Sequence, residues 1–264
     1  MQIVTSDMIN ASTCLFRHFA SPLPVGNLSL AHCHNHIEVV YIVSGSVALW
    51  LEDRKYVLGP GDLYLVRSSS YHYLEVLTPA PYERYTLHFL PETVQNIALP
   101  ETAETFKLPK KSVAAELFSR LDYYHDTLSE ADFAALLPLL IGELFFNLKI
   151  SCAGERQQTS SASPVLTKAL DYINSNLFSI KEIDEVAQAL FISSNYLFYL
   201  FRTTLHCSPK RYIVEKRLLA AQQMIRGGGN PTSVYADCGF REYSTFYRSY
   251  RSFFGYPPSQ EPPV

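Results

Sequence analysis

The sequence has little of what marks secreted, fibrous or disordered proteins. Its five cysteines are odd in number, widely spread and without a C-x-x-C pair, so we expect no disulfide framework. A reducing cytosol suits such thiols best. The N-terminus has no basic segment followed by an apolar one, so no secretory signal is expected. With 47% hydrophobic residues, the 264-residue chain can form two globular domains.

Long uninterrupted apolar runs are also absent. The longest, residues 133–150, contains Pro138, Glu143 and Lys149. These interruptions favour a buried helical segment over a membrane span. We therefore expect a cytoplasmic protein with no membrane partner.

Net charge is low, at -3, but it is unevenly distributed. Residues 164–264 carry eleven Lys and Arg against eight Asp and Glu, whereas residues 1–163 carry eleven against seventeen. A basic segment in an acidic chain is typical of a DNA-binding domain. Taken by itself, the charge pattern would also fit a solvated helical face.

Residues 181–254 hold two copies of one helical unit. Val186 and Leu197 in the first copy correspond to Val234 and Phe246 in the second, with a period of 48 residues up to the turn and 49 after it. Two short helices around a turn predict a helix-turn-helix. Because a helix fits the major groove, two such units predict a protein that contacts two neighbouring groove segments.

The second helix of each unit is expected to bury one face and to present the other to DNA. In the first unit Tyr196, Leu197, Leu200 and Phe201 should face the core; in the second, Phe246, Tyr250, Phe253 and Phe254. The predicted DNA-binding residues are Ser194, Asn195, Phe198, Tyr199, Arg202 and Thr203, then Glu242, Tyr243, Ser244, Tyr247, Arg248 and Arg251.

These residues carry a resemblance to the DNA-binding domain of AraC/XylS-type transcriptional regulators. The first unit matches their pattern I-x-x-V-A-x-x-L-x-I-S-x-x-Y-L-x-x-L-F-R at 183–202, and Ser208-Pro209 begins a matching joining helix. Gly239-Phe240 and Phe254-Gly255 match the second unit. The resemblance implies a regulator of promoter DNA, more often an activator that meets RNA polymerase, controlled by a small-molecule effector.

Four positions depart from the family pattern. Phe191 stands in the turn where its repeat partner is Gly239, and His206 stands where a helix-ending glycine is usual. In the second unit Tyr235 replaces a small alanine and Pro231 replaces an apolar helix residue. We therefore expect base recognition to depend more on Asn195, Tyr199 and Arg202 than on the second unit.

The N-terminal half is predicted to be β-rich. Short apolar runs at 39–43, 47–51, 63–66 and 85–89 are separated by turn segments at 44–46, 52–55 and 59–62. Such spacing favours a sandwich or barrel. Residues 112–150 then show helical periodicity, and 151–163 is polar and small, as in a linker.

The spacing Gly26-x5-His32-x-His34-x3-Glu38-x6-Gly45 resembles the first motif of the cupin superfamily, with His72 in a partial second motif. In metal-dependent cupins the positions of His32, His34, Glu38 and His72 bind a divalent transition metal, and this donor set suits one. Many AraC-like regulators keep this run while binding an effector, so no cofactor is required.

An organic effector is the other interpretation of these positions. The predicted effector-binding residues are His32, His34, Glu38, Tyr41, Trp50, His72 and Tyr85. Further candidates for lining the pocket are Tyr64, Tyr71, Tyr73 and His88. An equally simple interpretation is that most of these side chains belong to the core or surface of the barrel. The segment 82–84 resembles sugar-responsive regulators, so a sugar is one possible effector.

Together these patterns predict an α+β protein. It comprises a cupin-like β-barrel (1–110), a helical segment that could form a homodimer (111–150), a linker (151–163) and an all-α double helix-turn-helix domain (164–264). The alternative is a metal-dependent cupin oxygenase or isomerase with a helical appendage. We expect a regulator rather than an enzyme.

Overall fold

The computed structural model describes residues 2–6, 14–22, 31–77, 80–94, 97, 99–100, 104–109, 111–151, 160–161 and 163–261. The chain divides into two compact units, Met1–Ser160 and Ser161–Val264. Most of the predicted linker, like Gly26 and Cys152, lies outside the described residues.

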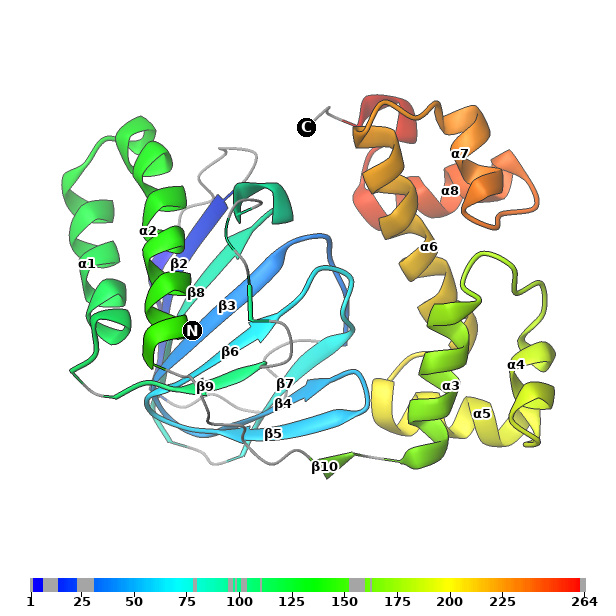
Figure 1. Cartoon of the computed structure of the whole chain (residues 1–264), viewed down its shortest axis with the longest axis horizontal. Helices are drawn as coiled ribbons and strands as arrows, with labels where there is room; N and C mark the ends of the chain where they lie inside the picture. Colours follow the sequence, from blue (N-terminus) through cyan, green and yellow to red (C-terminus); the bar gives the residue numbers. More distant parts are fainter. Residues whose placement is uncertain are drawn as a thin grey trace. The chain divides into compact units, whose positions relative to one another are not determined.

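The N-terminal unit contains two antiparallel sheets and two long helices, in agreement with the α+β prediction (Figure 1). The sheet orders are β1-β2-β8-β3-β6-β9 and β10-β5-β4-β7. Among the described strands no ladder joins one sheet to the other, so they form two sheets and not one closed barrel. The strands are β1 (Gln2–Ser6), β2 (Cys14–Ser21), β3 (Ile37–Ser44), β4 (Val47–Leu51), β5 (Arg54–Leu58), β6 (Asp62–Val66), β7 (His72–Val76), β8 (Tyr82–Phe89), β9 (Thr105–Lys107) and β10 (Ser160–Ser161).

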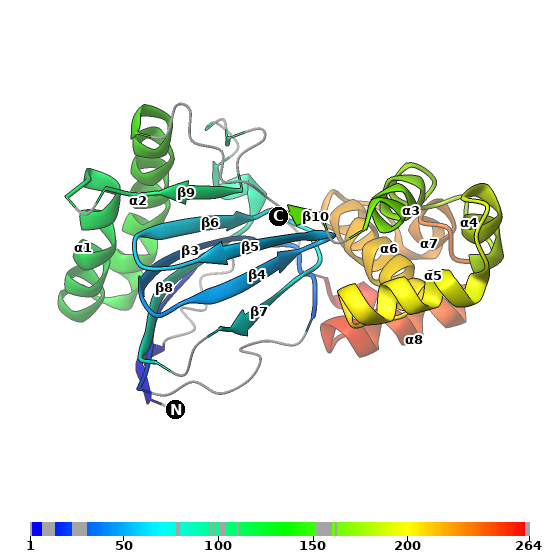
Figure 2. The ribbon, with the colours of Figure 1, turned by 90° about the horizontal axis from the view of Figure 1, so that it is seen from below.

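The central strands β3 and β6 of the six-stranded sheet are buried on both faces, which explains why their sequences are nearly continuously apolar. Helices α1 (Val113–Thr127) and α2 (Glu130–Ser151) cover one face (Figure 1). Figure 2 shows the strands of the smaller sheet on the side away from these helices. A short 3-10 helix, η1 (Pro91–Val94), follows β8.

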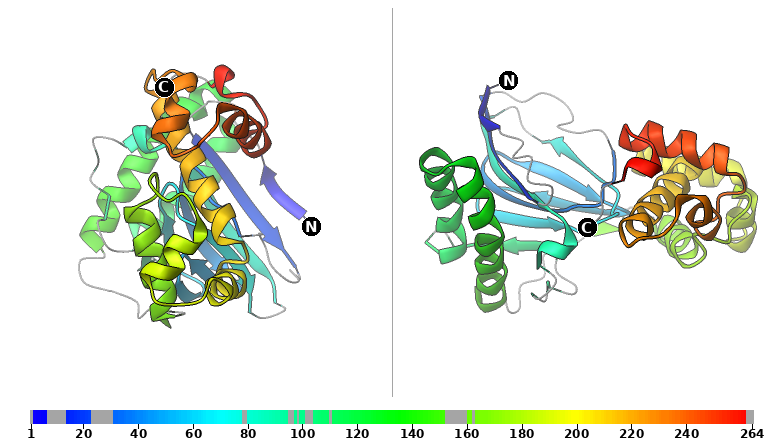
Figure 3. Two further views of the ribbon diagram at one scale, coloured as in Figure 1. Left: turned by 90° about the vertical axis from the view of Figure 1, so that its right-hand side faces the viewer. Right: turned by 90° about the horizontal axis from the view of Figure 1, so that it is seen from above.

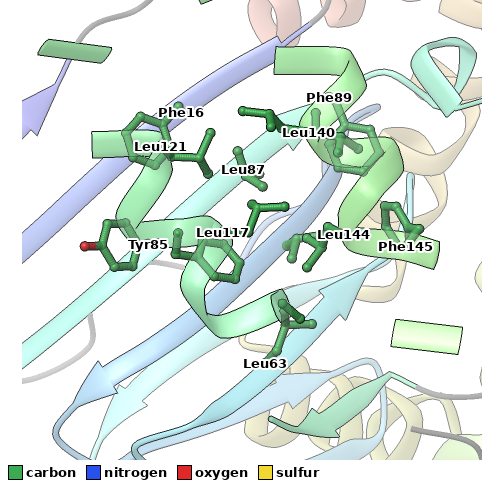
Figure 4. Close-up of a cluster of buried hydrophobic side chains, with 14 of the residues drawn as sticks. Phe16, Leu63, Tyr85, Leu87, Phe89, Leu117, Leu121, Leu140, Leu144 and Phe145 are labelled. Carbon is green, nitrogen blue, oxygen red and sulfur yellow. The ribbon is translucent and has the colours of Figure 1, made fainter. Parts of the chain in front are cut away.

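The core under the helices joins side chains of the sheet to side chains of α1 and α2. Residues labelled in Figure 4 include Phe16, Leu63, Tyr85, Leu87, Phe89, Leu117, Leu121, Leu140, Leu144 and Phe145, all buried. The predicted helical segment thus forms two helices, and the Ser112 side chain caps the first by accepting a hydrogen bond from the Ala115 amide.

Helix α2 has the length and apolar composition of a membrane span, as judged on the described residues alone. One of its faces is nevertheless packed in the core of the sheet, with Phe133, Leu137, Ile141 and Leu144 buried. The prediction of a helix that packs within the fold is therefore consistent with its contacts.

All four predicted strands are confirmed, since the apolar runs lie within β3, β4, β6 and β8. The run 47–51 coincides with β4, and Gly45 and Gly61 have positive φ in the predicted turns at 44–46 and 59–62. The predicted turn at 52–55 is too long, because only Glu52 and Asp53 form it and Arg54 already starts β5. Glu52 itself has φ +52°.

The C-terminal unit is helical, and the long helix α6 runs from its first half to its second (Figure 3). The predicted joining helix is thereby confirmed. The elements are α3 (Pro164–Ser175), α4 (Ile183–Ala189), α5 (Ser194–Leu200), the π-helical turn η2 (Phe201–Leu205), α6 (Pro209–Arg226), α7 (Pro231–Asp237), α8 (Tyr243–Phe254) and the 3-10 helix η3 (Pro258–Gln260).

Candidate functional site

Helices α4 and α5 form the first helix-turn-helix. The Ser193 hydroxyl caps α5 by accepting a hydrogen bond from the Tyr196 amide at 3.2 Å. Leu197, Leu200 and Phe201 are buried against the unit's core, as predicted. The π-helical turn η2 extends α5, and His206 ends it with φ +53°, in the left-handed region that a glycine would occupy without strain.

Most residues predicted to contact DNA from the first unit are exposed. They are Asn195, Phe198, Tyr199, Arg202 and Thr203. Two hydroxyls are already engaged within the protein, since Ser194 donates to Asp184 at 2.6 Å and Thr203 donates to the Tyr199 carbonyl at 2.8 Å.

The prediction that Tyr196 faces the core is wrong. Its side chain is 43% exposed and its ring is stacked on that of Tyr199, with centroids 6.3 Å apart. The exposed surface of α5 therefore carries one more aromatic ring than predicted.

Helices α7 and α8 form the second helix-turn-helix. Pro231 occupies the first turn of α7, where the missing N–H has no helical partner, and the Asn230 side chain caps that helix. The proline therefore starts the helix without interrupting it. Phe246 and Tyr250 are buried as predicted, whereas Phe253 and Phe254 are only half-buried.

The predicted DNA-binding residues of the second unit divide into two groups. Exposed are Glu242, Ser244, Arg248 and Arg251. Tyr243 and Tyr247 are half-buried, and the Tyr243 ring packs edge-on against Tyr235 at 5.6 Å. Tyr235 thus has a packing partner that the small residue usual at its position would not reach.

Arg217 of α6 connects the two helix-turn-helix units. Its guanidinium donates hydrogen bonds to the carbonyls of Leu177 (2.8 Å), Ile180 (2.6 Å) and Gly239 (2.8 Å). The first two acceptors precede α4, and the third lies in the turn between α7 and α8. Burial lowers the pKa of Arg217, but an arginine stays charged in a protein. This contact was not predicted, because nothing in the sequence distinguishes Arg217 from other basic residues.

The second candidate site is a histidine cluster in the N-terminal unit. The Nε2 atoms of His34, His72 and His88 lie 3.4, 3.1 and 3.3 Å from Glu38 Oε2. The His32 ring lies beside that of His72, with centroids 4.4 Å apart. Potential ligand atoms of His32, His34 and His72, and those of His34, Glu38 and His88, lie within 4.8 Å of one another.

Hydrogen bonds orient two of these rings. The Nδ1 atoms of His34 and His72 donate to the carbonyls of His36 and Ser70, both at 3.0 Å. A neutral imidazole with a proton on Nδ1 presents a lone pair at Nε2, and both Nε2 atoms face the Glu38 carboxylate. A lone pair facing a carboxylate requires a proton or a cation between them.

The electrostatics of Glu38 agree with this arrangement. Burial alone would raise the pKa of its carboxyl, but hydrogen bonds from His34, His72 and His88 outweigh burial and hold that pKa well below the usual value. Burial alone would lower the pKa of His72, because it disfavours the charged imidazolium. The hydrogen bond to Glu38 outweighs burial and raises that pKa. The imidazoles around Glu38 therefore favour the ionised form of its carboxyl.

The four residues predicted as metal ligands are brought together, and His88 of β8 joins them. His88 lies directly opposite Glu38 in the pairing of β3 with β8. The three remaining predicted effector-binding residues do not join this cluster. Tyr41 and Tyr85 stack on Phe118 of α1, and Trp50 stacks on Tyr73 at 5.8 Å.

Two family models match the chain. An AraC-like ligand binding domain covers residues 30–169, and a helix-turn-helix domain covers residues 186–261. The first spans more than half of the chain, and the second contains α5 to α8.

Individual relatives agree with these matches. The transcriptional regulator GbdR of Pseudomonas aeruginosa is 30% identical over 132 residues, which are 47% of this chain and 36% of that protein. The chain thus matches about a third of that relative's length. The Msm operon regulatory protein of Streptococcus mutans is 20% identical over 83% of this chain and 81% of its own. Among solved structures, apo ToxT of Vibrio cholerae aligns with a TM-score of 0.42 at 13% identity, covering 95% of this chain and 97% of its own.

Proposed function

Because the chain belongs to the AraC family, with its ligand-binding and helix-turn-helix domains both present, we propose that it is a sequence-specific transcriptional regulator controlled by a small-molecule effector. Two helix-turn-helix units joined by α6, with Arg202 exposed in the first and Arg248 and Arg251 exposed in the second, are the observation that carries this proposal. We place it in the cytoplasm as an activator that contacts RNA polymerase.

The contacts with DNA are assigned to α5 and α8. Asn195 and Tyr199 have side chains that can meet base edges, while Arg202, Arg248 and Arg251 can pair with phosphates or guanine. We propose that α5 contributes more to base recognition, since Tyr243 and Tyr247 of α8 are partly occupied in packing.

Selection of DNA from a random library by the full chain tests this function, because the operator is unknown. We expect one enriched motif with two half-elements, and weaker binding after Arg202→Ala and Arg248→Ala. Lys168→Ala, which removes an exposed cation on α3, is the matched control and should leave affinity unchanged. Failure to enrich any sequence at low salt would contradict the proposal.

A divalent transition metal in the histidine cluster is proposed as a second property of the N-terminal unit. The donor set fits such an ion, because imidazole Nε2 atoms oriented by backbone carbonyls converge on one carboxylate. His32, His34, Glu38 and His72 would hold it, with His88 close enough to replace one of them.

Elemental analysis of the purified chain tests the metal. We expect one equivalent that is lost on His34→Ala and retained on His125→Ala, a histidine of α1 outside the cluster. A metal-loaded protein that does not enrich DNA would instead favour the oxygenase or isomerase alternative. A metal-free wild type that binds DNA would leave only an organic effector.

A homodimer is proposed through the exposed face of α2. Leu139, Phe146 and Ile150 are exposed large apolar residues, spaced seven and four residues apart on one stripe of the helix. A second copy of the same stripe would cover them. We expect Leu139→Glu to lower the mass measured by light scattering from dimer to monomer, whereas Val57→Glu, at an exposed position of β5, should not.

A further inference from the structure

Three polar side chains of the larger sheet are among those in the described part of the N-terminal unit with buried atoms that have no hydrogen-bond partner. They are the hydroxyl oxygens of Tyr64 and Tyr82 and the Nε atom of Arg84. Both tyrosines are almost fully buried, at 0% and 1% exposure. Buried polar groups in folded proteins nearly always have a partner, so three orphans together call for an explanation.

These side chains share one face of the six-stranded sheet. Alternation along β8 puts Tyr82 and Arg84 on the same face, and Arg84 lies opposite Ile42 on β3. Tyr64 of β6 lies opposite Val40, two residues before Ile42. All but Arg84 belong to the buried cluster that also contains residues of the four-stranded sheet, so this is the face between the sheets.

Aromatic rings surround the guanidinium of Arg84. Its Cζ atom lies 5.6 Å from the centroid of Phe19 and 5.8 Å from that of Tyr82. No carboxylate among the described residues forms an ion pair with it. Glu38 exerts a favourable field at Arg84, but its Oε2 is already engaged by three imidazoles.

The free groups are hydrogen-bond donors. A phenol is neutral and keeps its O–H at neutral pH, so Tyr64 and Tyr82 can each donate a hydrogen bond. The Arg84 Nε atom and the two hydroxyls therefore lie on the face between the sheets, and none of these three groups has an acceptor at bonding distance from the residues that the structure describes. A planar carboxylate, with one negative charge and two acceptor oxygens, matches this set.

We propose that Arg84, Tyr64 and Tyr82 bind the carboxylate of a small organic acid, which is the effector of this regulator. This inference rests on the proposed function, since it names the chemical class of ligand for the sensing unit. A neutral sugar would leave the guanidinium without a directly bonded counter-charge, whereas the carboxylate of a sugar acid would supply one.

Formate, the smallest carboxylate, is the probe for this subsite. The melting temperature of the full chain is measured in sodium formate and in sodium chloride, at constant ionic strength. We expect formate to raise it by about 2–4 °C in a saturable way, as for a ligand that binds only the folded state. Arg84→Met should abolish the difference, and Arg17→Met, which removes an exposed arginine from β2 of the same sheet, should retain it.

Two conservative variants keep the test decisive if Arg84→Met does not fold. Tyr64→Phe and Tyr82→Phe remove only the unpartnered hydroxyls, so each should fold and need several-fold more formate for half the effect. Equal effects of the two salts on the wild type, or an unchanged formate effect in Arg84→Met or both tyrosine variants, would overturn the inference. DNA selection by the same proteins without formate shows separately whether the proposed function fails.

Discussion

The turn residues Phe191 and Gly239 show how one backbone geometry is built from two different side chains. Both have positive φ, +56° and +78°, at equivalent places in the two helix-turn-helix units. The repeat alignment predicted this match. A side chain fits at Phe191 because it is 97% exposed, whereas a Cβ on Gly239 would lie 2.4 Å from the Phe178 carbonyl oxygen.

We therefore expect opposite results from two substitutions in these turns. Phe191→Gly should raise the free energy of unfolding by up to about 1 kcal/mol, because glycine removes the cost of positive φ. Gly239→Ala should lower it by roughly 1–3 kcal/mol through the clash with Phe178. Urea unfolding of both variants measures this, and destabilisation by Phe191→Gly would contradict the strain argument.

Tyr196 shows where helical periodicity alone misled the prediction. The buried stripe of α5 and η2 consists of Leu197, Leu200, Phe201 and Leu205, and Tyr196 lies at its edge. Its repeat partner Thr245 is polar and exposed, so the second copy indicates an exposed side chain at this position. Residues at the border of a stripe are not assigned by spacing when the side chain is amphipathic.

The energetic consequence of this placement is measurable. Tyr196→Ala should change the free energy of unfolding by less than about 1 kcal/mol, as for other partly exposed residues. Leu197→Ala, one residue further along the helix, should cost about 2–5 kcal/mol because it leaves a cavity in the core. Thermal unfolding of the two variants compares them directly, and equal losses would show that Tyr196 belongs to the core.

At the scale of elements, α6 and its Arg217 join the two helix-turn-helix units. The sequence predicted α6, because its capping serine and proline mark the start of a long helix. It did not predict the three carbonyl contacts of Arg217, which join segments more than twenty residues away on either side. Long-range hydrogen bonds of this kind are absent from local sequence patterns.

Loss of these contacts should loosen the spacing between α5 and α8. We expect Arg217→Met to lower the free energy of unfolding by on the order of 3 kcal/mol, since charge-assisted bonds are lost and buried carbonyls remain unpaired. At a temperature where the variant is folded, its affinity for the two-element operator should fall at least tenfold. Affinity for a single half-element should stay unchanged, and an equal loss on both DNAs would rule out a role in spacing.

Some strands were predicted from the sequence and others were not, for a physical reason. Runs such as Val47–Leu51 are apolar throughout because both faces of the strand are buried, and the apolar run marks them clearly. Strand β7, in contrast, begins with His72, so its polar start was interpreted only as part of a metal motif. Motif spacing predicted the histidine cluster except for His88. That residue joins the cluster because β8 pairs with β3, and motif spacing does not reveal strand pairing.

For the whole molecule, the division into two compact units leads to the last prediction. Each unit has its own buried core, and that of the C-terminal unit includes Leu218, Val234, Phe246 and Tyr250. A fragment of residues 161–264 should therefore fold alone, with a cooperative thermal transition and the helical circular dichroism expected from α3 to α8.

The same fragment should separate DNA binding from sensing. We expect it to bind the operator selected by the full chain, with an affinity reduced by the loss of any dimer contact through α2. Formate or metal should change the DNA affinity of the full chain but not that of the fragment, because the histidine cluster and Arg84 lie in the other unit. Gel shifts with both proteins measure this. A fragment that folds and still responds to either ligand would place the sensing site in the helical unit, whereas an unfolded fragment would show that its core needs the N-terminal unit.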